Sequence, residues 1–334
     1  MQPCQKDSRS FFVKLQNAEG LDLRDNRGKR HELAIILIGV ALAVLSNRDG
    51  CLSSIHRHLV NHYEATVSAL GVEKQRPVSR SQLPRILEKV SVAVFDSLIF
   101  SHFGILLNEQ ERKWLAIDGK ELRGSIASGE KRGEVVVQVV AHKNGNTIAQ
   151  SYYCGTKESE VPTVRKLLES RELLTQKISL DALHCKSQTL EMINQGGGKY
   201  LVGLKANQKV LLKQAVREME SQAFFYQSTE QEKGHGRIET RSYEFYDLLE
   251  MKKADRWKDC RMQTLIKVNR LREELKAGKK SMETSYYVSN EVGTYEELRE
   301  AIRRHWQVET NNHIRDVTLK EDHLRSKKRI SVEH

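Results

Sequence analysis

WLAIDGKELRGS, residues 114–125, is the stretch that decides the fold of this chain. Its apolar first half predicts a buried strand, which runs directly into Asp118, a glycine and the cations Lys120 and Arg123. A strand that ends at a turn explains the stretch without any function, because Asp-Gly is a strong turn dipeptide and cations beyond turns are common on surfaces. The alternative is a strand that carries a carboxylate to a functional site, and the order of the elements that follow favours it.

The residues after this stretch alternate between strand and helix patterns. Two β-rich runs, EVVVQVVA and NTIAQSYY, flank Asn144-Gly145, which is a strong hairpin signal. A helical pattern, VPTVRKLLESRELL, leads to a short apolar strand that ends on Asp181, and the helix KSQTLEMINQ leads to the strand KYLVGL. Three antiparallel strands followed by helix-linked parallel strands predict an α/β fold with a ribonuclease-H-like mixed sheet and helices on both faces.

Such a sheet places its first and fourth strands side by side, so we expect Asp118 and Asp181 to be neighbours. Two carboxylates that lie close together repel each other in a low dielectric unless a cation lies between them. The pair therefore predicts a metal site.

A third acid comes from a late helix that begins after Thr294. On this helix Glu309 shares one stripe with His305, Asn312 and Asp316, because their spacing is i, i+4, i+7 and i+11. The stripe expected to dock on the sheet consists of Ile302, Trp306, His313 and Val317. Docking by this stripe leaves Glu309 at the boundary, where the helix can aim it at the two aspartates.

Two aspartates and a glutamate are the hard oxygen ligands that hold two Mg²⁺ ions, for which Mn²⁺ can substitute, in displacement reactions at phosphorus. Asp118, Asp181 and Glu309 are therefore the candidate catalytic and metal-binding residues. Lys120 and Arg123 would meet the phosphates of the substrate.

Composition favours a nucleic-acid partner. The chain has 334 residues and a formal net charge of +11, so a polyanion is the expected partner, with nucleic acid ahead of a membrane. Its five cysteines are scattered, which indicates neither a disulfide framework nor a thiolate zinc site and fits a reducing cytoplasm. The longest apolar run, LAIILIGVALAVL, is too short to span a bilayer and predicts a buried helix.

The periodicity changes near residue 110 from helical to strand-like, which predicts two domains. Residues 1–110 are expected to form a helical, DNA-binding domain, and residues 111–334 the sheet-containing catalytic domain. A β-rich insertion is expected at about residues 208–292, where RIETRSYEFYDL, CRMQTLIKVNRLREE and METSYYVSN have strand patterns. Trp257 and Trp306 are expected in the core, because a tryptophan is more often a core residue than a base-stacking one.

Several polar residues outside the acid set are candidates for contacts to DNA. Lys205 and Asn207 follow a strand, and their side chains can donate hydrogen bonds to phosphate, although a surface turn explains them equally well. His235, Arg237 and Arg241, in KGHGRIETR, either grip DNA or belong to a solvated loop and strand edge.

Five blocks of the sequence also resemble a known family: AIDGKELRGS, SLDALHCK, YLVGLKANQ, GHGRIETR and IRRHWQVETNNHIRDVTLKED. In this order they are similar to blocks of the DDE-type transposases of bacterial insertion sequences, in the group of the H-repeat-associated proteins. The resemblance implies that Asp118, Asp181 and Glu309 are the catalytic acids. It implies cutting and joining of double-stranded DNA at the terminal inverted repeats of the element and at a target, by a homodimer on paired ends. A bacterial cytoplasm with the nucleoid, and no membrane, is the implied location.

The late helix follows the HW…E…H…D pattern of this group, with Thr310 in place of the expected asparagine. Arg304 and His305 are expected to contact DNA, whereas the roles of His313 and Asp316 stay open. The chain stops at LRSKKRISVEH, where relatives continue with an apolar helix, so a truncated copy is expected. Two alternatives remain. One is an impaired, transposase-derived DNA-binding protein, which the intact set of three acids disfavours. The other is a nuclease with another cellular role, which the inserted strands disfavour.

Overall fold

The computed structural model describes residues 10–46, 51–103, 113–126, 128–154, 159–319 and 321–323. The chain separates into two compact units. One unit takes the described residues of Met1–Asn108, Glu121–Val136 and Asn311–His334, and the other takes those of Glu109–Lys120 and Val137–Thr310. The boundary expected near residue 110 lies outside the described residues.

The first unit contains six α-helices in its described part. These are α1 (Phe11–Gln16), α2 (Leu33–Leu45), α3 (Leu52–Asn61), α4 (Tyr63–Leu70), α5 (Gln82–Leu87) and α6 (Val92–His102). The long apolar run forms α2, as predicted. Its first half is mostly buried, whereas the second half buries Ala43 and exposes Leu42, Val44 and Leu45, the last at 82%. Leu59 and Tyr63 pack against α2 in the core of the unit. None of the helices in the described residues is both long enough and apolar enough to cross a membrane.

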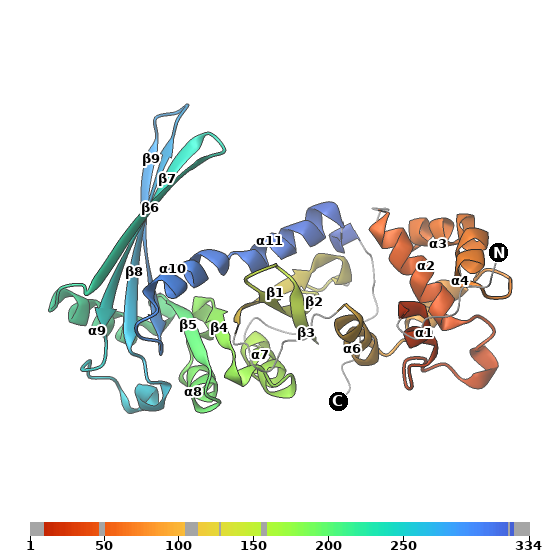
Figure 1. The fold of residues 1–334 in the computed structure, drawn as a ribbon, viewed down its shortest axis with the longest axis horizontal. Coiled ribbons are helices and arrows are strands. Elements are labelled where there is room, and N and C mark those ends of the chain that lie inside the picture. Colours follow the sequence, from red (N-terminus) through yellow and green to blue (C-terminus); the bar gives the residue numbers. More distant parts are fainter. Residues whose placement is uncertain are drawn as a thin grey trace. The chain divides into compact units, whose positions relative to one another are not determined.

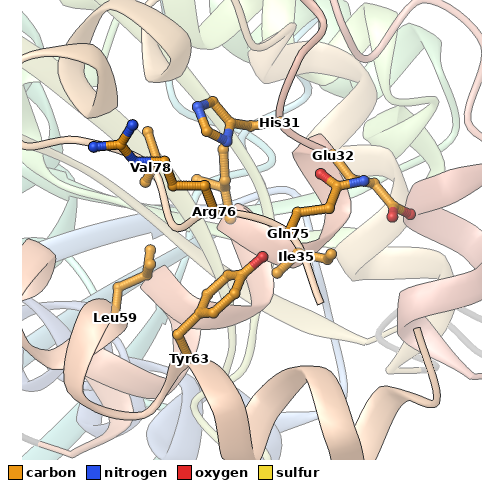
Figure 2. A pocket seen from close by; sticks show the side chains of 9 residues that line it. His31, Glu32, Ile35, Leu59, Tyr63, Gln75, Arg76 and Val78 are labelled. Atoms are coloured by element: carbon orange, nitrogen blue, oxygen red, sulfur yellow. The ribbon is translucent and has the colours of Figure 1, made fainter. Parts of the chain in front are cut away.

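A small cavity lies between α2 and the segment that follows α4 (Figure 2). It is lined by side chains that include Glu32, Tyr63 and Arg76. Its volume of about 10 Å³ leaves room for no more than a single water molecule, so it is not a ligand site.

The described residues form a nine-stranded sheet in the order β3-β2-β1-β4-β5-β9-β8-β7-β6 (Figure 1). Its strands are β1 (Trp114–Leu122), β2 (Glu134–Ala141), β3 (Thr147–Cys154), β4 (Lys177–Leu180), β5 (Lys199–Leu204), β6 (Tyr226–Gly234), β7 (Arg237–Asp247), β8 (Thr264–Glu274) and β9 (Lys280–Ser289). The helices that follow β3, β4 and β5 are α7 (Glu160–Ser170), α8 (Ser187–Gln195) and α9 (Lys209–Glu220). The chain is therefore a mixed α/β protein with a large sheet.

The first and fourth strands are neighbours, as predicted. Strand β1 pairs with β4 in parallel, and β4 pairs with β5 in parallel. The last paired residues of β1 and β4 are Ile117 and Leu180, so Asp118 and Asp181 each come one residue later. The two aspartates therefore follow equivalent positions on neighbouring strands.

The structure excludes the alternative interpretation of Asp118-Gly119 as a turn that ends the strand. Strand β1 continues through both residues to Leu122. Gly119 has another reason to be a glycine, because a Cβ atom there would lie 2.5 Å from the Oε2 atom of Glu160. The glycine makes room for a neighbouring side chain, and no reversal of the chain depends on it.

The strands predicted as an insertion continue the same sheet. Strand β9 pairs antiparallel with β5, and β8, β7 and β6 follow in antiparallel order. Figure 1 shows these four strands as a long, twisted arm of their unit. The sequence did not predict β6, because YQSTEQEKG has no run of apolar residues. As the edge strand of the sheet it is mostly exposed, and polar residues are ordinary there.

Helices cover both faces of the central strands. Figure 1 shows α8 on one side of β4 and β5 and α10 (Tyr295–Arg304) on the other. The late helix is interrupted after Arg304 and resumes as α11 (Gln307–His313).

The predicted docking stripe is right for Ile302, which packs against the core of the sheet, and wrong beyond the interruption, because spacing along one continuous helix does not hold across a break. Trp306 is 66% exposed and Val317 59% exposed. The docked side chains are instead Leu298, Ala301 and Val308, each at most 1% exposed. Trp257, by contrast, is buried at 2% exposure, as predicted.

Candidate active site

Asp118 lies in an electrostatic environment that disfavours its charge. It is half-buried in β1, and its pKa is raised to about 6. Burial is the main cause, followed by the negative charges of Glu160 and Asp181, with a smaller effect of Glu309. Two other acids predicted from the sequence, Asp181 and Glu309, therefore lie close enough to Asp118 to affect its pKa. Glu160, which was not predicted, does so as well.

Asp181 is held by the backbone that follows it. Its Oδ1 atom accepts a hydrogen bond of 2.8 Å from the Leu183 amide and thereby caps the 3-10 turn Ala182–His184. Behind this turn, the Asn207 side chain donates to the Ala182 carbonyl oxygen. Asp181 therefore has a defined orientation at the end of β4.

Glu160 is the acid that sequence reasoning missed. It begins α7 and is only 4% exposed. Its Oε1 atom lies 3.0 Å from Nε2 of the fully buried His184, and the Tyr153 hydroxyl donates to Oε2 over 3.4 Å. A glutamate in the first turn of a helix is an ordinary helix start, so the sequence carried no signal for its position.

Glu309 is exposed on α11, one residue after the anchor of that helix. Val308 is fully buried in a small cluster with Ala116 of β1 and Val140 of β2. The anchor fixes the start of α11 beside the strand that carries Asp118, which explains why Glu309 acts electrostatically on Asp118. Glu309 is thus near enough to Asp118 to raise its pKa slightly, although a different stripe of the helix docks.

Two histidines meet at the hydroxyl of Ser179, two residues before Asp181. The Oγ atom of Ser179 lies 2.8 Å from His142 Nε2 and 2.9 Å from His305 Nδ1, and it donates to the Leu115 carbonyl oxygen over 3.3 Å. With its proton given to Leu115, the hydroxyl accepts from both rings. Burial lowers the pKa of His142 to about 3 and that of His305 to about 4, so both rings are neutral at pH 7.

The acid set has the chemistry of a magnesium site. Within the described residues, no three His, Cys, Asp or Glu side chains have the spacing of a formed metal site. The donors are nevertheless carboxylate oxygens, which Mg²⁺ and Mn²⁺ prefer. Besides burial, the negative charges of Glu160, Asp181 and Glu309 raise the pKa of Asp118. Asp118, Asp181 and Glu309 therefore fit a divalent cation.

A groove of about 930 Å³ leads from the tip of the β6–β7 hairpin to Glu309. Its lining includes five of the residues predicted to contact DNA, namely His235, Arg237, Arg241, Arg304 and His305. Exposed Trp306 lines it as well. The groove thus connects the arm with the acid cluster inside one unit.

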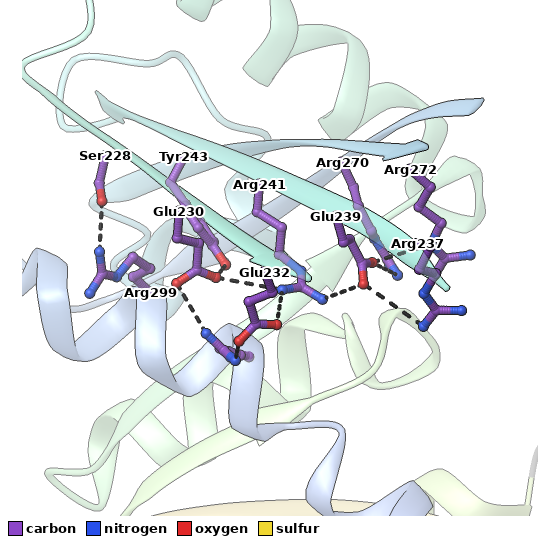
Figure 3. Close-up of polar contacts among 11 residues, drawn as sticks. Ser228, Glu230, Glu232, Arg237, Glu239, Arg241, Tyr243, Arg270, Arg272 and Arg299 are labelled. Atoms are coloured by element: carbon purple, nitrogen blue, oxygen red, sulfur yellow. Dashed lines mark hydrogen bonds and ion pairs between the residues drawn. The ribbon is translucent and has the colours of Figure 1, made fainter. Parts of the chain in front are cut away.

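The wall of the groove is a network of arginines and glutamates (Figure 3). At its centre is Glu239, whose carboxylate lies 3.0 Å from Arg241, 3.2 Å from Arg272, 3.6 Å from Arg270 and 3.9 Å from Arg237. Burial alone would raise the pKa of Glu239, but the Arg272 hydrogen bond and the nearby arginine charges hold it below its usual value. Arg241 and Arg270 also pair with further carboxylates, those of Glu230, Glu232 and Glu283.

The other predicted DNA contacts lie away from the groove lining. Lys205 is exposed after β5, and Arg123 is exposed after β1. Lys120 is buried at 8% exposure, because strand geometry turns it to the same face of β1 as Asp118, two residues earlier. Asn207 is committed to the Ala182 carbonyl oxygen. Arg304, by contrast, lines the groove and also donates to the His142 carbonyl oxygen at 3.0 Å. His313 is exposed beyond Glu309, and Asp316 is half-buried.

Comparison with known proteins agrees with the geometry. Residues 109–334 match the family model described as "Transposase DDE domain". The "H repeat-associated putative transposase YhhI" of Escherichia coli (strain K12) is 26% identical over 311 residues, which cover 90% of this chain and 81% of that protein. The "Putative transposase YncI" of Escherichia coli O157:H7 is 24% identical over 325 residues, which cover 93% of this chain and 81% of that protein.

Proposed function

We propose that this chain, which belongs to the transposases with a DDE domain, cuts DNA at the ends of its own insertion sequence and joins those ends to a target. The reaction is expected to depend on divalent cations held by the acid cluster. The substrate is double-stranded DNA that carries the terminal inverted repeats of the element.

One observation carries the proposal: Asp118 and Asp181 follow equivalent positions on neighbouring strands, and Asp118 is destabilised in its charged form. A protein tolerates this repulsion when the acids have a cation to hold. Asp118, Asp181 and Glu309 would bind two Mg²⁺ ions, for which Mn²⁺ can substitute. Such ions, when bound, supply the activation of an attacking oxygen and the stabilisation of a leaving oxygen.

The order of the strands supports a ribonuclease-H-like catalytic domain. The sheet contains the order β3-β2-β1-β4-β5. Its parallel pairs, β1–β4 and β4–β5, have helices in the connections between their strands. We take residues 111–334 as this domain and the helical residues 1–110 as a DNA-binding domain. A homodimer would bring the two ends of the element together, because each end needs its own set of acids.

The groove supports DNA as the substrate that approaches Glu309. Six arginines line it, and an arginine can meet phosphate oxygens in bidentate fashion. If these contacts carry the affinity, the logarithm of the binding constant falls linearly with the logarithm of the salt concentration, with a slope of about −0.9 for each phosphate neutralised. A flat dependence between roughly 50 and 200 mM salt would exclude the groove as the DNA surface.

The decisive experiment is a cleavage assay on DNA that carries the inverted repeats flanking the gene. Mg²⁺ and Mn²⁺ should support cleavage and joining. Ca²⁺ should support binding without cleavage, because it accepts irregular coordination that activates an oxygen poorly. Cleavage that proceeds undiminished in excess chelator would contradict the proposal.

A further inference from the structure

Glu160 is a buried charge without a matching cation. Among the described residues, no lysine or arginine forms an ion pair with it, and its partners are the His184 ring and the Tyr153 hydroxyl. Burial of a charged carboxylate costs free energy unless the charge is paired with a cation or coordinates a metal. Its position therefore calls for an explanation beyond packing.

Gly119 shows that the approach of Glu160 to β1 is built into the chain. A Cβ atom at this position would lie 2.5 Å from Oε2 and 2.6 Å from Cδ of Glu160. The backbone of Gly119 does not adopt the left-handed conformation that favours glycine, so space is the reason for the missing side chain. The carboxylate thus lies against the residue that follows Asp118.

His184 connects Glu160 to the second aspartate as well. It ends the 3-10 turn that Asp181 caps, and its Nε2 atom must donate the proton in the 3.0 Å bond to Glu160. Glu160 is consequently held between the strand of Asp118 and the turn of Asp181. Among the charged groups around Asp118, it has the largest electrostatic effect.

We propose that Glu160 is a fourth acid of the site, and that its charge, held by His184 and Tyr153, strengthens the binding of a divalent cation beside Asp118 and Asp181. This inference rests on the proposed function, since it assumes a cation at the acid cluster. Glu160 is a positioning and charge-supplying residue, and it needs no direct contact with the metal.

The test is calorimetric titration of the full-length protein with Mn²⁺, without DNA. Glu160→Gln keeps the size of the side chain and can still accept from His184, but it removes the charge. Gly119→Ala keeps the Glu160 charge, but the added methyl group displaces the Glu160 carboxylate from β1. Both variants should weaken Mn²⁺ binding by about 10- to 100-fold, the range typical of partners outside the direct ligand shell.

Glu297→Gln is the matched control. Glu297 lies in the same unit, and its Oε1 atom accepts from Trp114 Nε1 at 2.8 Å and pairs with Lys177 at 2.5 Å, but it is not among the groups that shift the pKa of Asp118. Its Mn²⁺ affinity should stay within twofold of wild type. Asp118→Asn is the positive control and should weaken binding at least as much as Glu160→Gln.

The melting temperature in chelator distinguishes a loss of Mn²⁺ binding caused by the missing charge from one caused by a destabilised fold. Loss of the Glu160 charge relieves repulsion with Asp118, so Glu160→Gln should melt no lower than Glu297→Gln. If Asp118→Asn weakens Mn²⁺ binding while Glu160→Gln and Gly119→Ala bind like the control, the inference about Glu160 is wrong and the proposed function stands. If Asp118→Asn also leaves Mn²⁺ binding unchanged, the proposed metal site itself is wrong.

Discussion

The acid cluster and the arm of the sheet use carboxylates in opposite ways. At the cluster, burial and then the charges of neighbouring acids raise the pKa of Asp118 to about 6. On the arm, Glu239 is also buried, but four arginines surround it and its pKa is lowered. Both regions lie in one compact unit and border the same groove.

The difference shows where a ligand is needed. The arm satisfies Glu239 with the cations of its own strands, so this part of the structure is complete within the chain. At the acid cluster, the neighbouring charges that raise the pKa of Asp118 are other acids, and the proposed function assigns the balance of their charge to a divalent cation. Substitutions that remove a carboxylate charge from the acid cluster or from the arm test this difference.

The largest effect is expected for amides at the acid cluster. Asp118→Asn, Asp181→Asn and Glu309→Gln should lower cleavage about a thousandfold or more, because each removes a ligand charge that stabilises the transition state by several kcal/mol. Binding to end DNA, measured by gel shift, should change only a few-fold.

Asp316→Asn is the control for the third acid. Asp316 lies beyond the end of α11, in the π-helical segment Ile314–Thr318, so its amide should lose much less activity than Glu309→Gln. Abolished cleavage in Asp316→Asn together with intact cleavage in Glu309→Gln would show that the third acid is misassigned.

The next effect concerns the pH dependence of stability in chelator. The pKa of Asp118 is about 6 in the folded protein and 3.8 ordinarily, so its contribution is fully present below about pH 4 and is lost as the pH rises through 6. The ionised group then costs roughly 3 kcal/mol at neutral pH. Asp118→Asn should therefore unfold at higher urea than wild type at pH 7.5, and the difference should shrink at pH 5.

Comparing the two proteins at each pH cancels the effect of His142 and His305, which titrate in both. Their lowered pKa values remove stability as the pH falls below 6.5. Added Mg²⁺ should close the gap at pH 7.5 by stabilising the wild type alone. An equal gap at pH 5 and pH 7.5 would mean that Asp118 is not destabilised by its charge.

A smaller effect is expected for Glu239→Gln on the arm. Removal of this charge leaves Arg241, Arg270 and Arg272 facing one another, and should lower the free energy of unfolding by about 2 kcal/mol. The control is Glu273→Gln, which loses only an exposed pair with Lys280 and should cost less than about 1 kcal/mol. Urea unfolding measures both, and equal losses would mean that the network around Glu239 contributes no more than a surface pair.

The smallest effect is expected at Trp306, between the two regions. Because its side chain is 66% exposed, Trp306→Ala should change the free energy of unfolding by less than about 0.5 kcal/mol. Val308→Ala, two residues later in the buried anchor of α11, should cost about 2 kcal/mol. The reverse ranking in urea unfolding would show that the predicted docking stripe was right after all.

Local patterns predicted most of the central sheet. Periodicity and turn signals identified β1 to β5 with α7 and α8, and their order placed Asp118 beside Asp181. The same reasoning missed β6, because an exposed edge strand needs no apolar alternation. It also misplaced Trp306, because the break after Arg304 cannot be read from helical spacing.

The sequence by itself determined the alternation of strands and helices, the two aspartates at neighbouring strand positions and the resemblance to transposases, since these depend on residues close in the chain or on a fixed order of blocks. Only the tertiary structure decided that Glu160 lies against Gly119, 41 residues earlier in the chain, and that four arginines from two strands share Glu239. The physical reason is that packing and strand pairing bring together charged groups that are far apart in the sequence. Burial and charge, which set the pKa of each carboxylate, depend on all neighbours in space.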